Sequence, residues 1–226
     1  MQKIGDQEIR WPIAVLLIII GATYFSGLDN EFVFDDLSVL KNNICLGDLS
    51  SLKHLFTWDY FATFSEYTYR PLSSFTYWFD AWIWGHRSFG YHVTNLILHL
   101  ATVAALFGLV HALGGNFRPA FLTAAVFGLN PVFSEAVYCS GFREDLLVAL
   151  TSILVLTVVV SSSRHLSGRR RVGLAGWLFV LALLSKESAA AIPPVCLIIL
   201  LFNSPGIPLN IEKDRKRTTG ILFCVL

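Results

Sequence analysis

Long apolar segments are the feature that most constrains the fold of this 226-residue chain. A helix needs roughly 20 mostly apolar residues to cross a bilayer core, because lipid cannot hydrogen-bond to exposed backbone groups. Six apolar segments of 11 to 23 residues are candidate spans, and a seventh begins near Gly220. The six run from about Trp11 to Phe25, Tyr91 to Leu113, Pro119 to Val137, Glu144 to Val160, Val172 to Ala190 and Ile192 to Phe202. The sequence therefore predicts an all-α fold, a polytopic transmembrane helix bundle.

The composition excludes several other classes of protein. Charged residues make up 15% of the chain, whereas a soluble domain carries about 25%. The formal net charge is only +1, so we expect no nucleic-acid partner. The four cysteines form no CxxC pair and have no histidine at zinc-finger spacing, which argues against a zinc module or a disulfide scaffold. Cys45 and Cys139 are both expected outside the cytosol, where a disulfide between them could form.

The two ends of the chain suggest part of a larger membrane protein. Lys3 and Arg10 precede the first apolar segment as they would in a secretory signal, but no small-x-small cleavage site follows, which favours a retained signal anchor. A natural C-terminus rarely lies a few residues inside a hydrophobic segment. We therefore interpret residues 1–226 as a partial membrane domain of about six transmembrane helices and the start of a seventh.

Basic residues predict the orientation, since cytoplasmic loops are enriched in Lys and Arg. If the helices alternate in direction, the basic clusters before and between them all lie on one side, and the N-terminus is cytosolic. These clusters contain Lys3, Arg10, Arg118, Arg164, His165, Arg169, Arg170, Arg171, Lys213, Arg215, Lys216 and Arg217.

The opposite side of the membrane collects acidic and paired-charge residues. It holds the external loop 28–90 and the turns 130–143 and 186–194. The charged residues there are Asp35, Asp36, Glu135, Arg143, Glu144, Asp145, Lys186 and Glu187. This convergence predicts a functional site at the external water boundary.

The external loop is dense in aromatic residues, which settle at the headgroup level of a bilayer. Apolar residues repeat at helical spacing over 49–56 and again over 72–82, so we expect short interfacial helices. Pro71 follows Arg70 at the position that a first helical turn permits. An interfacial anchor with no further role is the alternative interpretation of these aromatics.

Asp35 and Asp36 directly follow the first apolar segment. Adjacent carboxylates suit a proton acceptor, because one can take a hydroxyl proton while the other holds a partner. The alternative is a helix N-cap at Asp35 or Asp36, before a turn over residues 37–41.

Polar residues inside the second apolar segment share one helix face: His92, Asn95 and His99. Inter-helix hydrogen bonding is the favoured interpretation. The two histidines are two turns apart, so they cannot bind the same metal ion.

Arg143 follows the break that Asn130-Pro131 predicts in the third segment. It could pair structurally with Glu135 or Asp145, or it could bind a phosphate through its bidentate fork. Lys186 offers a second cation on the same side.

Six motifs in order resemble one known family. They are Phe-Val-Phe-Asp-Asp (32–36), Tyr-Arg-Pro-Leu (69–72), Tyr-His-x-x-Asn-x-x-x-His (91–99), Asn-Pro-Val-Phe-Ser-Glu-Ala-Val (130–137), Gly-Phe-Arg-Glu-Asp-Leu-Leu (141–147) and Leu-Ser-Lys-Glu-Ser (184–188). Residues 25–190 look like the N-terminal membrane half of the transmembrane O-mannosyltransferases with C-terminal tetratricopeptide repeats. These belong to the type C glycosyltransferases.

The resemblance implies an integral membrane enzyme. It would transfer a sugar, mannose in eukaryotic members, from a polyprenyl-phosphate donor to protein hydroxyls on the lumenal or periplasmic side. The membrane would be the endoplasmic reticulum in a eukaryote and the inner membrane in a bacterium. The family's acidic pair corresponds to Asp35 and Asp36, and its external Glu and Arg correspond to Glu135 and Arg143. Family members often carry His in place of Asn130, and the later helices and repeats are missing here, so we expect an incomplete donor pocket in this chain alone.

The residues themselves suggest an inverting displacement with no covalent intermediate. Asp35 or Asp36 would accept the acceptor's proton, and Arg143, with Arg70 or Lys186, would stabilise the departing phosphate. His92 and Glu135 are expected near the donor's phosphate and sugar.

We expect no cofactor or metal, although an acidic pair could hold Mg²⁺ or Mn²⁺. The expected partners are the polyprenyl-phosphate sugar, an acceptor protein and the lipid bilayer. A transporter or flippase, or a structural membrane subunit, is the alternative function. A transporter would carry polar residues through the depth of several helices and show inverted repeats.

Overall fold

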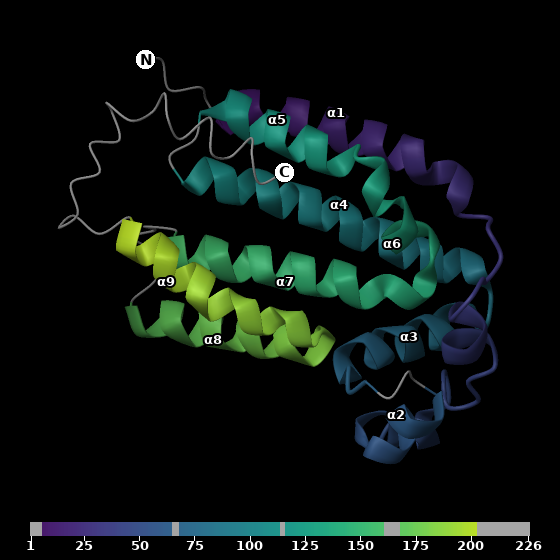
Figure 1. Ribbon diagram of the computed structural model, residues 1–226. Coiled ribbons are helices and arrows are strands. Elements are labelled where there is room, and N and C mark those ends of the chain that lie inside the picture. The colour runs from purple at the N-terminus through teal and green to yellow at the C-terminus, as the bar shows by residue number, and fades with distance from the viewer. Residues whose placement is uncertain (1–5, 65–67, 114–115, 161–167, 203–226) are drawn as a thin grey trace. The chain divides into compact units, whose positions relative to one another are not determined.

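The computed structural model describes residues 6–64, 68–113, 116–160 and 168–202, and these residues form helices and turns without any strand (Figure 1). The prediction of an all-α fold is confirmed for them. The chain divides into two units, Met1–Ile192 and Pro193–Leu226. The described part of the second unit is residues 193–202, which belong to α9 (Ile192–Phe202), a short apolar helix with two prolines in its first turn.

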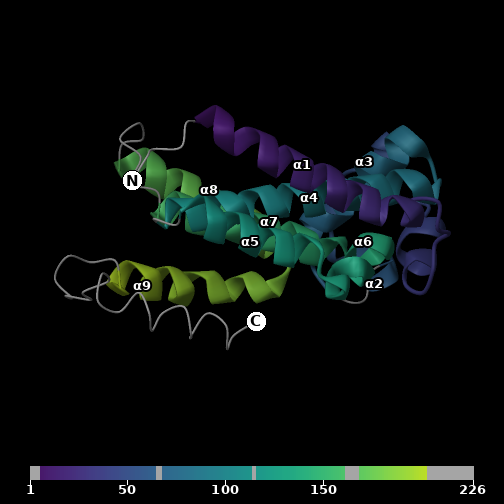
Figure 2. The ribbon, with the colours of Figure 1, turned by 90° about the horizontal axis from the view of Figure 1, so that it is seen from above.

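The longer helices of the first unit are α1 (Asp6–Tyr24), α4 (Ser88–Ala112), α5 (Phe117–Gly128), α7 (Arg143–Val160) and α8 (Gly168–Ser185). Helix α4 packs against α1, α5 and α7, and α7 packs against α8 (Figures 1 and 2). Ile20 of α1 and Val103 of α4 belong to their shared apolar core. A Cβ at Gly128 would lie 2.3 Å from the Cδ1 of Ile20, so glycine permits the close approach of α5 to α1.

The span count is smaller than the six expected. By length and composition, α4 alone could cross a membrane among the described helices, or two spans result if the bent pair Phe117–Gly128 and Pro131–Tyr138 counts as one. The 25 residues of α4 give this helix a length of about 37 Å. Helices α7 and α8 form at the expected places, but each has 18 residues with three charged side chains. The seventh apolar segment lies outside the described residues, as do seven of the basic-cluster residues: Lys3, Arg164, His165, Lys213, Arg215, Lys216 and Arg217.

The external loop folds over one end of these helices. The turn η1 (Phe25–Gly27) precedes the loop. The loop contains α2 (Trp58–Phe64), α3 (Pro71–Trp84) and the single turns η2 (Leu37–Lys41), η3 (Leu49–Ser51) and η4 (His54–Phe56). A core that includes Phe32, Leu40, Phe61, Trp78 and Tyr91 joins the loop to the start of α4.

One of the two expected loop helices is confirmed, and the other is corrected. Helix α3 begins at Pro71 as predicted. The segment 49–56 forms two short 3₁₀ turns instead of a helix. The carboxylate of Asp48 accepts hydrogen bonds from the backbone N–H and the hydroxyl of Ser50. Such local bonds from Ser and Asp side chains compete with helix formation.

Helix α3 has two distinct faces. Tyr77, Trp78 and Asp80 are buried on one face, whereas Phe75, Phe79 and Trp82, which belong to the predicted apolar repeat, are exposed on the other. An interfacial helix has this arrangement, because it packs on protein through one face and leaves an aromatic face for the headgroup region.

The predicted break at Asn130-Pro131 is confirmed. The side chain of Asn130 accepts a hydrogen bond from the backbone N–H of Val132 at 3.0 Å, and the chain bends by 48° there. The turns η5 (Pro131–Phe133) and η6 (Ser140–Phe142) flank the short helix α6 (Ser134–Tyr138), which leads into α7. The thiols of Cys45 and Cys139 are free, so the suggested disulfide is absent.

Candidate functional site

The predicted site residues meet at the end of the first unit where the external loop, α6 and the start of α7 come together (Figures 1 and 2). The short turn η7 (Glu187–Ala191), which follows α8, reaches the same region through the contact of Arg70 with Glu187. The residues form three groups: the Asp35–Asp36 pair with a neighbouring cavity, the buried Arg143, and an ionic cluster around Arg70 and Lys186.

Asp36 is fully buried and joins the external loop to the α6–α7 junction. Its carboxylate accepts hydrogen bonds from the backbone N–H groups of Gly141 at 2.6 Å, Ser140 at 3.3 Å and Val33 at 3.4 Å. The thiol of Cys139 lies 3.5 Å from the same carboxylate. The N-cap interpretation is right in position only: Asp36 is the N-cap residue of η2, but its side chain makes no capping hydrogen bond there. Its carboxylate instead binds the backbone N–H groups of Ser140 and Gly141 in η6.

Asp35 differs from Asp36 in its surroundings. Its side chain is exposed, and its carboxylate has no hydrogen-bond or ion-pair partner among the described residues. The preceding residue, Phe34, has a φ of +49° and an 84% exposed ring. A bulky residue held in this region of φ costs roughly 1–3 kcal/mol, and such strain clusters at functional sites.

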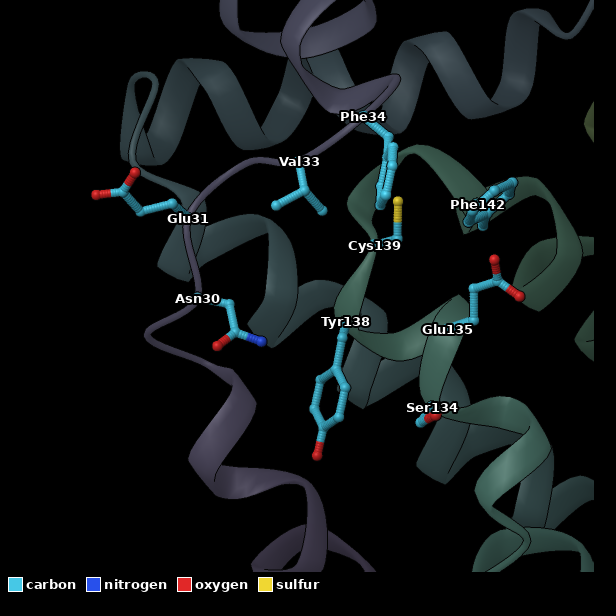
Figure 3. Close-up of a pocket in the computed structure, with 9 residues that line it drawn as sticks. All are labelled: Asn30, Glu31, Val33, Phe34, Ser134, Glu135, Tyr138, Cys139 and Phe142. Carbon is cyan, nitrogen blue, oxygen red and sulfur yellow. The ribbon is translucent and has the colours of Figure 1, made fainter.

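A cavity of about 330 Å³ is lined in part by Val33 and Phe34, which directly precede the Asp35–Asp36 pair (Figure 3). Its wall comes from the external loop and from the α6–α7 junction. The lining residues are Asn30, Glu31, Val33, Phe34, Ser134, Glu135, Tyr138, Cys139 and Phe142. In Figure 3, Glu135 lies next to Phe142, and Phe34 lies next to Cys139. Because Cys139 also contacts Asp36, the cavity and the acidic pair share one wall.

Arg143 is fully buried and surrounded by hydrogen-bond acceptors. Its Nε donates to the Oδ1 of Asn95 at 2.7 Å, its Nη2 donates to the carbonyl of Tyr91 at 3.0 Å, and its Nη1 lies 3.4 Å from the hydroxyl of Thr76. Nη2 also forms an ion pair of 2.6 Å with the Oδ2 of Asp80, at an angle outside that of a hydrogen bond. The expected pairing with Glu135 or Asp145 is wrong.

Asp80 is the main residue of the site that sequence reasoning missed. It is 2% exposed, and its Oδ1 accepts a hydrogen bond of 2.7 Å from Thr94. Tyr77 adds a cation–π contact, with its ring centroid 4.7 Å from the Cζ of Arg143. A lone acidic residue inside an otherwise apolar helix was the signal available in the sequence. The buried pair holds α3, α4 and α7 together.

The polar face of α4 makes the inter-helix hydrogen bonds that the sequence favoured. The Nε2 of His92 lies 3.1 Å from the carbonyl of Asn30, and its Nδ1 lies 3.3 Å from the hydroxyl of Ser140. The Nδ2 of Asn95 donates to the carbonyl of Ala136, and the Nε2 of His99 lies 3.1 Å from the carbonyl of Gly128. A contact of the buried His92 with the sugar donor stays a prediction.

The ionic cluster lies where α3 begins, α7 begins and α8 ends. The Nη1 of Arg70 pairs with Glu144 at 2.9 Å, and its Nη2 and Nε pair with Glu187 at 2.8 and 3.3 Å. Lys186 pairs with Asp145. The hydrogen bond from Arg70 lowers the pKa of Glu187 below its ordinary value. Unlike Arg143, both cations are partly exposed, with side-chain exposures of 14% and 22%.

The arrangement can therefore supply an exposed carboxylate beside a cavity and two cations reachable from solvent. In the part of the chain that the structure describes, no three His, Cys, Asp or Glu side chains cluster as metal ligands would.

Sequence comparison relates the chain to known proteins. The family model described as dolichyl-phosphate-mannose-protein mannosyltransferase matches residues 70–226. The chain is 30% identical to protein O-mannosyl-transferase F38B6.6 of Caenorhabditis elegans, over 88% of its own length and 29% of the relative's. It is 27% identical to mouse protein O-mannosyl-transferase TMTC3, over 92% of this chain and 23% of the relative. It is 29% identical to human protein O-mannosyl-transferase TMTC1, over 93% of this chain and 25% of the relative.

The chain thus spans about a quarter of the length of these curated relatives. No solved structure matches it. The match of the family model over most of the chain, beginning at Arg70 of the ionic cluster, shows that this chain belongs to the dolichyl-phosphate-mannose-protein mannosyltransferase family.

Proposed function

We propose that this chain forms part of an integral membrane glycosyltransferase. The enzyme transfers mannose from a polyprenyl-phosphate donor to Ser or Thr hydroxyls of proteins, with inversion at the anomeric carbon. The family membership and the names of the relatives support the activity. The gathering of an exposed carboxylate, a cavity and two accessible cations at one end of the helices supports its location on the chain.

The different burial of Asp35 and Asp36 is the observation that carries the mechanism. A general base must reach the proton that it accepts. The oxygens of Asp36 are held by backbone N–H groups, with the closest at 2.6 Å, whereas Asp35 is exposed and directly follows Phe34, which lines the cavity. We therefore assign the base to Asp35 and a positioning role to Asp36, which fixes the loop against Gly141.

Arg70 and Lys186 are the cations best placed to receive the donor phosphate. A lipid-linked donor keeps its chain in the bilayer and its phosphate at the interface, and preorganised cations stabilise the charge that develops on such a leaving group. The guanidinium of Arg143 is fully buried against Asp80 and Asn95. Arg143 then supports the site by fixing the start of α7, which carries Glu144 and Asp145.

The chemical step is a single displacement. The acceptor hydroxyl oxygen forms a bond to the anomeric carbon as the bond from that carbon to the phosphate oxygen breaks. The phosphate leaves with the bonding electron pair, and the hydroxyl proton passes to a carboxylate oxygen of Asp35. The cavity between Phe34 and Phe142 would hold the acceptor segment next to this oxygen.

The chain would be a multi-pass protein with a cytosolic N-terminus, in the endoplasmic reticulum of a eukaryote or the inner membrane of a bacterium. The length of α4 supports at least one crossing. Arg118 in the first turn of α5 and Arg169–Arg171 in the first turn of α8 lie at the helix ends opposite Asp36, as the positive-inside rule requires.

The test is turnover of the full-length enzyme carrying Asp35→Asn or Asp36→Asn. With polyprenyl-phosphate mannose and a Ser/Thr peptide, Asp35→Asn should lower kcat by about 10²–10⁴-fold, the usual contribution of a general base, with thermal stability and donor binding unchanged. Asp36→Asn should also lower the melting temperature, because an amide is a weaker acceptor for three backbone N–H groups. Asp59→Asn, an exposed carboxylate in the same loop, is the control. Wild-type turnover by Asp35→Asn would refute the assignment.

A further inference from the structure

We propose that the carboxylate of Glu187 occupies the phosphate-binding edge of Arg70 in the free enzyme, and that a phosphate ester binds by taking its place. This inference rests on the proposed function, because it concerns how phosphate binding at the proposed donor site is regulated. It makes Glu187 a residue that sets the affinity of Arg70 for phosphate.

The two edges of the Arg70 guanidinium have different partners. Nη1 binds Glu144, whose side chain is 8% exposed and which belongs to the first turn of α7. Nε and Nη2 bind the two carboxylate oxygens of Glu187, whose side chain is 71% exposed. One carboxylate therefore fixes the guanidinium from the protein side, and the other covers the edge that faces solvent.

A phosphate ester fits the edge that Glu187 covers. The Nε and Nη2 atoms of arginine form a planar fork that binds two oxygens of a carboxylate or of a phosphate in the same bidentate manner. The non-bridging oxygens of a phosphate ester can therefore replace the Oε1 and Oε2 atoms of Glu187 without moving Arg70. Glu144 keeps the guanidinium in place during the exchange.

The exchange is energetically accessible. Exposed ion pairs contribute only about 0–1 kcal/mol, because water solvates each partner well when they separate. Glu187 lies in a short turn and not inside a long helix, so its side chain can rotate into solvent. Among the described residues, two cations, Arg70 and Lys186, face three carboxylates in this cluster. Departure of Glu187 removes the excess negative charge that repels an incoming phosphate.

The shared ligand chemistry is a phosphate group with two free oxygens, and it can come from a membrane lipid or from solution. The experiment therefore measures two probes on the full-length enzyme in nanodiscs: polyprenyl phosphate incorporated in the bilayer, and inorganic phosphate in the buffer. The variants are Glu187→Gln and, as a matched control that removes one carboxylate elsewhere in the loop region, Asp59→Asn.

Glu187→Gln should bind phosphate about two- to fivefold more tightly than the wild type, as expected for removal of an exposed ion pair that competes with the ligand. In the transfer assay, KM for the donor should fall by a similar factor without a rise in kcat. Asp59→Asn should change neither quantity. Tightening with polyprenyl phosphate alone identifies a membrane-held ligand, and tightening with both probes identifies a general phosphate site.

The proposal is overturned if Glu187→Gln binds both probes no more tightly than the wild type, or if Asp59→Asn produces the same gain. Because binding is measured without turnover, the result is separate from the proposed function. A tighter Glu187→Gln complex in a protein that transfers no mannose would sustain the phosphate exchange and refute the transferase assignment.

Discussion

The substitution Asp80→Asn should destabilise the protein more than loss of any other ion pair described above. It keeps the shape of the side chain but leaves the Arg143 guanidinium without its charged partner. Both side chains are buried, with exposures of 3% and 0%. Water cannot compensate the unpaired charge in this position.

The expected loss follows from what remains around Arg143. Removing one partner of a buried pair typically costs about 3–5 kcal/mol. Arg143 keeps its hydrogen bonds to Asn95 at 2.7 Å and to the carbonyl of Tyr91 at 3.0 Å, so the lower value of about 3 kcal/mol applies. For a cooperatively unfolding unit of the size of this chain, 1 kcal/mol shifts the melting temperature by about 2–4 °C, which gives a decrease of about 6–12 °C in the transition of the unit that contains Asp80.

The assay is thermal unfolding of the full-length protein in detergent, followed by tryptophan fluorescence. Asp145→Asn, which breaks the partly exposed pair with Lys186, is the control and should cost less than about 1 kcal/mol. The double variant Asp80→Asn/Arg143→Met should be more stable than Asp80→Asn alone, because it removes the unpaired charge. Equal melting temperatures for Asp80→Asn and Asp145→Asn would refute the reasoning.

Two further predictions test the packing around the site. Burial, reinforced by the charge of Asp36, raises the pKa of the Cys139 thiol from 9.0 to about 12. The protonated thiol thus stabilises the fold fully below pH 9, and this contribution is lost as the pH rises toward 12. The thiolate is the reactive form, so the rate of maleimide labelling of Cys139 should keep rising above pH 9. A labelling rate that levels off near pH 9 would contradict the raised pKa of this thiol. Gly27→Ala should cost about 1–3 kcal/mol by overpacking, because its Cβ would overlap the ring of Tyr138. Gly108→Ala has open space around it and should not lower the melting temperature.

Local sequence signals were enough to place the helices. Apolar length, Pro71 at a first turn and Asn130-Pro131 at a break are each properties of a few neighbouring residues, and the observed boundaries agree with them within a few residues. The helix expected over residues 49–56 failed for a local reason as well, since Asp48 and Ser50 bind each other and interrupt it. The six expected spans are not confirmed, because α7 and α8 have only 18 residues each and carry three charged side chains at their starts.

The partners within the site depended on tertiary contacts, which the sequence could not specify. Alternating helices predicted that the candidates share one end of the helices, and contacts such as that of Arg70 with Glu144 and Glu187 bring several of them together there. The side of the membrane stays a prediction. The division between Asp35 and Asp36 depends on a turn more than a hundred residues away. Arg143 finds its counter-charge on α3 and not on its sequence neighbour Asp145, because α3 packs against the start of α7.

The hydrogen bond between Asp36 and Gly141 joins residues 105 positions apart, which has a consequence for biosynthesis. When the ribosome has completed the external loop, the donors that will hold Asp36 have not yet been made. The loop therefore lacks this hydrogen bond until residues 139–141 have been made. A substitution that slows the folding of α6 should also delay the step that fixes Asp36 in place.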